Sequence, residues 1–291
     1  MTRTSCRSRL ATTTPADSLC WGYNEYGQIG SGSSGPPVTS PAKVATGVRF
    51  TRLVMSFATT CGLAADGRVW CWGANTDGTF GNGTTTGSPL PVQSAGSHVF
   101  TALEGGDESF CGIDAQGDAW CWGDGDDGEL GQGEWKDSDI PVKVVGGHQW
   151  SMLARGSHHS CGLATSGSTW CWGEGDAGEL GAPGVPYTHT PVEITGNHNF
   201  VAISAGEWHT CGRTAGSEVW CWGWNGQGQL GSGNTISGAN PVRVQGGDQF
   251  TSIHPSGWST CGLLATGQAK CWGYNEDGQV GDGTNTMRTT P

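Results

Sequence analysis

Apolar and polar residues follow one another in short runs along this chain, and the same arrangement returns every fifty residues. In the copy at residues 61–73, an apolar-rich run is followed by Asp66-Gly67 and then by a second run that ends in Cys-Trp-Gly. An Asp-Gly pair between two such runs is a strong signal for a β-hairpin. The pattern predicts hairpins at residues 6–22, 61–73, 111–123, 161–173, 211–223 and 261–273.

Two further short strands are expected between successive hairpins. One has the motif Pro-Val-x-Val, as at residues 141–144, and its opening proline and alternating polar residues suit an outer edge strand. The other reads Phe/Trp-x-x-Leu/Ile, as at residues 100–103. Four strands in each fifty-residue repeat, with no helix pattern, are typical of a β-propeller blade. We expect an all-β fold, a β-propeller of about six to seven four-stranded blades, as one domain over residues 1–291.

The spacing of the cysteines selects the register of each hairpin. If Gly67 takes the left-handed position of a bulged turn, Cys61 faces Cys71 with Cα atoms roughly 4.5 Å apart. A disulfide spans such a distance. A plain two-residue turn would instead place the two sulfurs on opposite faces of the hairpin. The predicted disulfides, one per blade, are Cys6–Cys20, Cys61–Cys71, Cys111–Cys121, Cys161–Cys171, Cys211–Cys221 and Cys261–Cys271.

The same register sets a glycine opposite a tryptophan. Gly62 faces Trp70, and we expect the glycine to leave room for the indole ring. The last copy departs from this pattern, because Lys270 stands opposite Gly262. The last hairpin is therefore expected to be less well packed than the others.

Paired cysteines indicate an oxidising compartment. Thiol ligation of a metal is the alternative, but zinc sites favour Cys-x-x-Cys spacings and the chain has none. Residues 1–20 are polar and carry no apolar segment of a signal peptide. Either an export signal lies upstream of residue 1 or the cysteines are reduced in a cytosol. We favour a secreted or cell-surface protein.

Composition excludes several classes of function. The formal net charge is −12, and the 14 Lys and Arg residues are scattered, which argues against nucleic acid as a partner. No apolar run approaches the length of a membrane span. Hydrophobic residues make up 35% of the chain and 15 are tryptophans, which is enough to build a core despite 52 glycines.

The repeat resembles a known family. The string Trp-Gly-x-Asn-x-x-Gly-Gln-Leu-Gly-x-Gly at residues 222–233, together with Gly-x-x-His-Thr at residues 206–210, is similar to the repeat of the regulator of chromosome condensation. The resemblance implies a propeller with blades of about fifty residues, usually seven, whose termini share one blade. The paired cysteines resemble those of bacterial secreted members.

Function follows from this resemblance only in part. The family's namesake is a nucleotide exchange factor for the GTPase Ran and binds nucleosomes, through an inserted wedge and basic segments that this chain lacks. Relatives include a plant ultraviolet-B receptor and a secreted inhibitor of β-lactamases, so the fold does not determine the function.

The loops before the first cysteine of each hairpin differ in sequence among the repeats. On a rigid scaffold such loops commonly carry binding, and in a propeller they would gather on one face. In the alternative interpretation, His209 and Thr210 only bond the neighbouring backbone. The candidate binding residues are Glu108, His158, His159, Trp208, His209 and Trp258.

Other chemistry is not expected. A metal site at His158, His159 and His209 is disfavoured because adjacent strand residues point opposite ways. The acidic turn at residues 124–129 lacks the ligand spacing of a calcium loop and is expected to be a solvated turn. The Gly-x-Gly-x-x-Gly match at residues 123–128 precedes no helix, so we expect no nucleotide cofactor there. We expect no catalytic residues and no cofactor.

Six hairpins come with only five complete sets of the other two strands. The natural chain could be longer, the ring could close imperfectly, or a neighbouring molecule could donate an edge strand. We expect a non-enzymatic binding module for an unknown protein or glycan. The alternatives are a self-assembling structural protein that uses open blade edges and, by family analogy, a guanine-nucleotide exchange factor.

Overall fold

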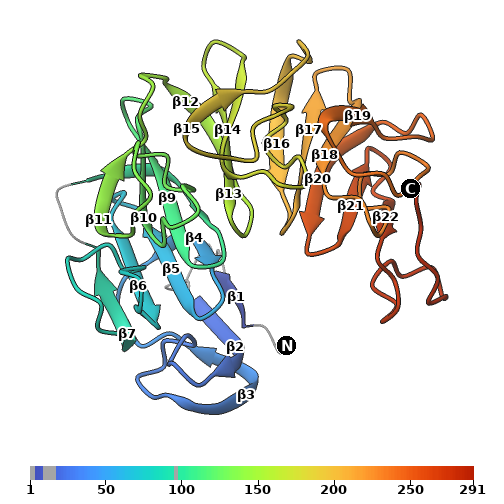
Figure 1. Ribbon diagram of the computed structural model, residues 1–291. Helices are drawn as coiled ribbons and strands as arrows, with labels where there is room; N and C mark the ends of the chain where they lie inside the picture. The colour runs from blue at the N-terminus through green and yellow to red at the C-terminus, as the bar shows by residue number, and fades with distance from the viewer. Residues whose placement is uncertain (1–3, 9–17, 95–97) are drawn as a thin grey trace. The chain divides into compact units, whose positions relative to one another are not determined.

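The computed structural model describes residues 4–8, 18–94 and 98–291, and its secondary structure consists of strands, turns and bends (Figure 1). The chain forms two compact units, Met1–Asp126 with Trp135–Lys143 and Asp127–Glu134 with Val144–Pro291. We describe each unit by itself. None of the described residues belongs to a helix that could cross a membrane.

The first unit contains three antiparallel sheets, with strand orders β1-β2-β3, β4-β5-β6-β7 and β11-β10-β9-β8. Its strands are β1 (Ser5–Ser8), β2 (Ser18–Asn24), β3 (Gly35–Lys43), β4 (Phe50–Met55), β5 (Thr59–Ala64), β6 (Val69–Gly73), β7 (Ser88–Gln93), β8 (Phe100–Gly105), β9 (Ser109–Asp114), β10 (Ala119–Gly123) and β11 (Ser138–Lys143).

The second unit also contains three antiparallel sheets, with orders β12-β13-β14-β15, β16-β17-β18-β19 and β20-β21-β22. Its strands are β12 (Trp150–Arg155), β13 (His159–Ala164), β14 (Thr169–Glu174), β15 (Tyr187–Glu193), β16 (Phe200–Ala205), β17 (His209–Thr214), β18 (Val219–Gly223), β19 (Gly238–Arg243), β20 (Phe250–Ser256), β21 (Ser259–Leu264) and β22 (Ala269–Gly273).

The sheets confirm the predicted β-propeller blade. In each four-stranded sheet the predicted hairpin supplies the two middle strands, and the Pro-Val strand is at one edge, where it pairs with the hairpin's second strand. At the end of the chain, an isolated bridge joins Gly273 to Arg288. It corresponds to the pairing of Gly223 with Gly238 in the preceding sheet.

The predicted hairpin register is also confirmed. Cys61 pairs with Cys71 across β5 and β6, and the Cα atoms lie 4.1 Å apart. Gly67 has φ +80°, and its amide donates to the carbonyl of Ala64 at 3.0 Å, which closes the turn. All twelve cysteines form the six expected disulfides, with Cα distances of 4.0–4.1 Å.

The reason for the strand glycines differs from the prediction. Gly62 does face Trp70, but the ring lying over the glycine belongs to Phe50, on the neighbouring strand β4. A Cβ atom at Gly62 would come within 2.5 Å of that ring. Gly262 is under the same constraint, since a Cβ there would lie 2.3 Å from Phe250. The expectation that these glycines leave room for the opposite indole was therefore wrong.

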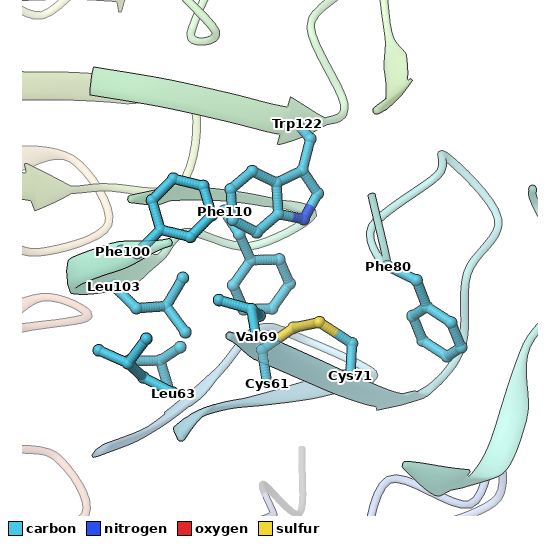
Figure 2. Packing of buried hydrophobic residues seen from close by; sticks show 10 residues of the cluster. Cys61, Leu63, Val69, Cys71, Phe80, Phe100, Leu103, Phe110 and Trp122 are labelled. Atoms are coloured by element: carbon cyan, nitrogen blue, oxygen red, sulfur yellow. A yellow bond between two sulfur atoms is a disulfide. The ribbon is translucent and has the colours of Figure 1, made fainter. Parts of the chain in front are cut away.

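The core of each unit is built where the face of one sheet meets the next. In the first unit, Cys61–Cys71, Leu63 and Val69 pack against side chains of the following sheet (Figure 2). These side chains are Phe100, Leu103, Phe110 and Trp122. The disulfides are thus part of the apolar core, and their burial favours close sheet stacking.

The last hairpin is less buried, as predicted. Leu263 on β21 is 40% exposed, whereas Leu163, at the same position two repeats earlier, is 6% exposed. Both cysteines of this hairpin are only partly buried.

A buried tryptophan links each repeat to the one before it. The indole Nε1 of Trp172 donates to the carbonyl of Glu129 at 2.8 Å, and that of Trp222 donates to Glu179 at the same distance. Both indoles are fully buried. A Cβ atom at Gly131 would lie 2.7 Å from the Trp172 ring, and Gly131 has φ +66°, so only glycine fits there. The remaining bonds of this kind are Trp72 to Gln28, Trp122 to Thr79 and Trp272 to Gln229.

Candidate binding loops

Two positions in each repeat are held side by side by one backbone hydrogen bond. The first precedes the first hairpin cysteine by three residues, and the second follows the Cys-Trp-Gly motif. We call them the paired positions. The amide of the second donates to the carbonyl of the first at 2.8–3.0 Å in five repeats: Ala74 to Ala58, Asp124 to Glu108, Glu174 to His158, Trp224 to Trp208 and Tyr274 to Trp258.

The glycine of Cys-Trp-Gly makes this bond possible. Gly173 has φ +100°, and a Cβ atom there would lie 2.4 Å from the carbonyl oxygen of His158. Gly223 is in the same situation, with the carbonyl of Trp208 at 2.7 Å. Any larger residue would push the loop away. The hydrogen bond therefore fixes the loop backbone, while the side chains at the paired positions differ among the repeats.

In the second unit, the paired positions of two repeats carry aromatic rings. Trp258 is 43% exposed and makes edge contacts with Trp224, at 5.9 Å between ring centroids, and with Tyr274, at 5.5 Å. The Trp208 ring lies 5.5 Å from that of His158. We call Trp208, Trp224, Trp258 and Tyr274 the aromatic cluster. The contacts of Trp258 with Trp224 and Tyr274 have the edge-to-face arrangement that aromatic pairs prefer.

The structure separates the candidate histidines. His158 is half-buried, whereas its neighbour His159 is buried and its Nε2 lies 2.8 Å from Thr210 Oγ1. His209 is likewise buried, with Nε2 at 2.8 Å from Thr260 Oγ1. These contacts join successive hairpins. His159 and His209 thus have an interior structural contact, as in the alternative interpretation for His209, but their partner is a threonine hydroxyl and not the backbone.

Burial keeps the two interior histidines neutral. Removal from water lowers the pKa of His209 to about 3. The pKa of His159 is also lowered to about 3, chiefly by burial and then by the charge of Arg155. Among the described residues, His158 shares a group of potential ligand atoms with Asp127 and Glu174, whereas His159 and His209 belong to no such group.

In the first unit, the paired positions of one repeat carry carboxylates. Glu108 is exposed, and its carbonyl accepts from the amide of Asp124 at 3.0 Å. Nearby, the pKa of Asp77 is raised by burial and by the charges of Asp137 and Asp126. Asp124, Asp126 and Asp137 have carboxylate oxygens within 4.8 Å of one another. This acidic turn is partly exposed.

A mixed cluster occurs in the second unit. His158 Nδ1 lies 2.9 Å from Asp127 Oδ2, and Glu174 brings a carboxylate oxygen within 4.8 Å of both. Tyr187 donates its hydroxyl to Glu174 Oε1 at 3.3 Å and to Asp176 Oδ2 at 2.8 Å. Burial raises the pKa of Glu174, although the adjacent His158 acts in the opposite direction.

Sequence reasoning found only the first of the two paired positions. The second holds Glu174, Trp224 and Tyr274, which were not among the candidates. A signal was present, because the residue after Cys-Trp-Gly varies widely among repeats, whereas the residue that follows it is only Asn or Gly. What the sequence does not reveal is the backbone bond that joins the two positions.

Comparison with known families identifies the repeat. The family model described as Regulator of chromosome condensation (RCC1) repeat matches residues 66–111, 116–163, 166–212 and 217–263. A second model of the same repeat matches residues 43–79 and 200–229.

Solved structures share the fold. Human WBSCR16 superimposes with a TM-score of 0.90 at 18% identity, covering 99% of this chain and 79% of that one. Prp20p from Saccharomyces cerevisiae matches with a TM-score of 0.83 at 19% identity, covering 95% and 74%. The ectodomain of the Physcomitrella patens receptor kinase CR4 matches with a TM-score of 0.60 at 23% identity, covering 93% and 59%. At these identities the likeness concerns the fold alone.

Proposed function

Because the chain belongs to the family of the regulator of chromosome condensation (RCC1) repeat, we propose that it is a non-enzymatic, secreted or cell-surface protein that binds a protein partner. The binding surface is the aromatic cluster of the second unit. The observation that carries the proposal is the partly exposed group of rings around Trp258, held on loops whose backbone is pinned. Rigid aromatic side chains supply large contact area at low entropic cost, and Trp and Tyr are enriched at binding hot spots.

The chemistry of the surface favours a basic partner. Carboxylates flank the rings, with Glu276 accepting from the Tyr274 hydroxyl at 3.0 Å. The chain as a whole carries a net charge of −12. Aromatic faces attract Lys and Arg side chains, and a negative field speeds the association of a positive partner. The partner therefore presents exposed Lys or Arg residues.

Two further observations support this proposal. The yeast propeller Prp20 has been described in complex with Kap60 and as binding Gsp1p and histones, which are protein partners. Six disulfides are compatible with an extracellular location, where such bonds persist.

The proposal is tested with the whole chain and panels of immobilised peptides and glycans. We expect binding to Lys- and Arg-containing peptides that weakens as salt is raised, and no binding to matched Glu-containing peptides. Trp258→Ala should weaken this binding about 30-fold or more, because hot-spot truncations cost 2 kcal/mol or above. Trp135→Ala is the matched control, since Trp135 is 47% exposed and lies outside the aromatic cluster.

Other outcomes would replace the proposal. Selective binding to a glycan would assign the cluster to sugar recognition, and equal binding by the Trp258→Ala and wild-type proteins would remove the cluster from the interface. Release of GDP from loaded small GTPases above background would favour nucleotide exchange. A native mass that rises with concentration would favour self-assembly.

A further inference from the structure

Three side chains from three separate segments converge in the second unit. Asp127 comes from the turn after β10, His158 from the loop between β12 and β13, and Glu174 from the end of β14. Each offers one ligand atom, and these atoms all lie within 4.8 Å of one another. In a metal complex with bonds of about 2 Å, donor atoms are about 3–4 Å apart, so small side-chain adjustments bring these three into range.

The donor set distinguishes among cations. One imidazole and two carboxylates suit a first-row transition metal, and Zn²⁺ accepts this combination with three protein ligands and a water in the fourth position. Calcium and magnesium prefer oxygen ligands alone and use more of them. The all-carboxylate group Asp124, Asp126 and Asp137, by contrast, contains no nitrogen donor, and two of its side chains are exposed, whereas Asp127, His158 and Glu174 are all partly buried.

The imidazole is placed for ligation. His158 Nδ1 is shielded from solvent and lies 2.9 Å from Asp127 Oδ2, yet among the described residues this nitrogen has no hydrogen-bond partner. The ring is supported by that of Trp208 at 5.5 Å. The backbone beneath it is tied to Glu174 by a 2.8 Å hydrogen bond. A nitrogen with this environment is available to a metal ion.

The Glu174 carboxylate is also contacted by a hydroxyl group outside the cluster. The Tyr187 hydroxyl shares its proton between Asp176 Oδ2, at 2.8 Å, and Glu174 Oε1, at 3.3 Å. Hydrogen bonds to a ligating carboxylate orient it and are a common feature of metal centres. The equivalent positions in the next repeat hold Ala177, Trp208 and Trp224. In the preceding repeat the equivalent positions hold Asp77, Glu108 and Asp124. The combination of an imidazole with two carboxylates is therefore particular to this repeat.

We propose that Asp127, His158 and Glu174 bind a divalent transition metal ion, with Zn²⁺ as the best match. The ion would join Asp127 to the loop before β13 and to the end of β14. It would neutralise two carboxylates that lie close together. Within the aromatic cluster, Trp208 contacts the ligand His158, whereas Trp258 contacts Trp224 and Tyr274. Variants of Trp258 therefore test the partner separately from the metal.

The experiment is calorimetric titration of the untagged full chain with ZnCl₂ after treatment with a chelator. We expect one tight site in the wild-type protein, which is lost in His158→Ala and in Glu174→Gln. Tyr187→Phe should weaken Zn²⁺ binding about tenfold through the lost support of Glu174. Co²⁺ bound in place of Zn²⁺ should give the visible absorption of a low-coordinate ion with nitrogen and oxygen ligands.

His198→Ala is the matched control. The His198 ring also packs on a tryptophan, Trp220, with centroids 4.4 Å apart, but His198 is not one of the clustered ligands. This variant should bind Zn²⁺ as the wild-type protein does. The proposal is overturned if the wild-type protein gives no saturable heat, or if folded His158→Ala protein, checked by its melting curve, binds Zn²⁺ equally well. Trp258→Ala should retain the metal, which separates the two proposals.

Discussion

The paired positions of the two units use one backbone arrangement for opposite chemistry. In the first unit, Glu108 and Asp124 are joined by the amide-to-carbonyl bond and present two carboxylates. In the second unit, the same bond joins Trp258 and Tyr274, which present two rings. The glycine after the hairpin tryptophan is present in both cases. Position and chemistry are thus determined by different residues.

This comparison teaches that most of the repeat contributes stability, while a few side chains are free to contribute binding. The buried residues that stabilise the loops are the indoles, the disulfides and the interior histidines. The side chains at the paired positions are exposed or partly buried, and the backbone bond that joins the two positions does not involve them. The predictions below test this separation, from the largest expected effect to the smallest.

Trp222→Ala should have the largest effect. This indole is fully buried and donates to the carbonyl of Glu179, so its loss leaves a cavity and an unpaired carbonyl. We expect the free energy of unfolding to fall by about 3–5 kcal/mol. Trp258→Ala, by contrast, should cost less than about 1 kcal/mol. Urea unfolding of both variants measures these changes. Similar losses of unfolding free energy would contradict the separation between residues that stabilise the repeat and residues that are free to bind.

Acid should destabilise the second unit through its buried histidines. His159 and His209 have folded-state pKa values of about 3, below the ordinary value of 6.5, so the unfolded chain takes up more protons between these limits. Stability is then lost as the pH falls through 6.5 toward 3. Glu179 acts in the opposite sense, because burial raises its pKa to about 7.

Two histidines and one opposing glutamate leave the effect of about one titrating group. The free energy of unfolding should therefore fall by roughly 1–3 kcal/mol between pH 6.5 and 4.5. Melting curves at several pH values measure it. The double variant His159→Gln, His209→Gln keeps polar side chains but cannot titrate there. An unchanged acid slope in this variant would exclude the histidines as its cause.

Glu179→Gln should have a smaller effect of opposite sign. The buried carboxyl prefers its protonated form, so its contribution is unfavourable once the pH rises through 4.5–7. Gln229 occupies the same position in the next repeat and accepts a similar backbone bond. Its amide nitrogen has no hydrogen-bond partner among the described residues, which reduces the gain. We expect about 1 kcal/mol of added stability at pH 8 and little change at pH 4.5, measured by urea unfolding.

Exchanging the chemistry of the paired positions should alter stability least. Trp258→Glu with Tyr274→Asp gives the second unit the carboxylates of the first. Because the backbone bond does not involve these side chains, the free energy of unfolding should change by less than about 1 kcal/mol. Binding of basic peptides should lose its aromatic component, which a salt titration measures. A large loss of stability would show that the rings support the loops.

The hairpins were predictable because their signals are local. The Asp66-Gly67 turn and the ten-residue cysteine spacing were sufficient to place Cys61 opposite Cys71. The ring over Gly62 was missed because Phe50 lies on another strand, outside the hairpin.

The candidate site was less predictable. Alternation along a strand showed that His158 and His159 face opposite ways, but only packing with the next hairpin determines that His159 is the interior one. The second paired position stayed hidden because its partner lies sixteen residues away, as for Glu174 and His158. Residues that vary among repeats reveal where the chemistry is, but not which of them meet.

The indole-to-carbonyl link gives a repeat that lies between two others the same coupling at each end. The loop of one copy offers an acceptor, and the tryptophan of the next copy, as Trp172 and Trp222 show, offers the donor. A gene segment of one period, duplicated in frame, would therefore encode a copy that fits between two existing ones. The loops of the new copy can then change in sequence, because its tryptophan donor and its carbonyl acceptor already bond to the neighbouring copies.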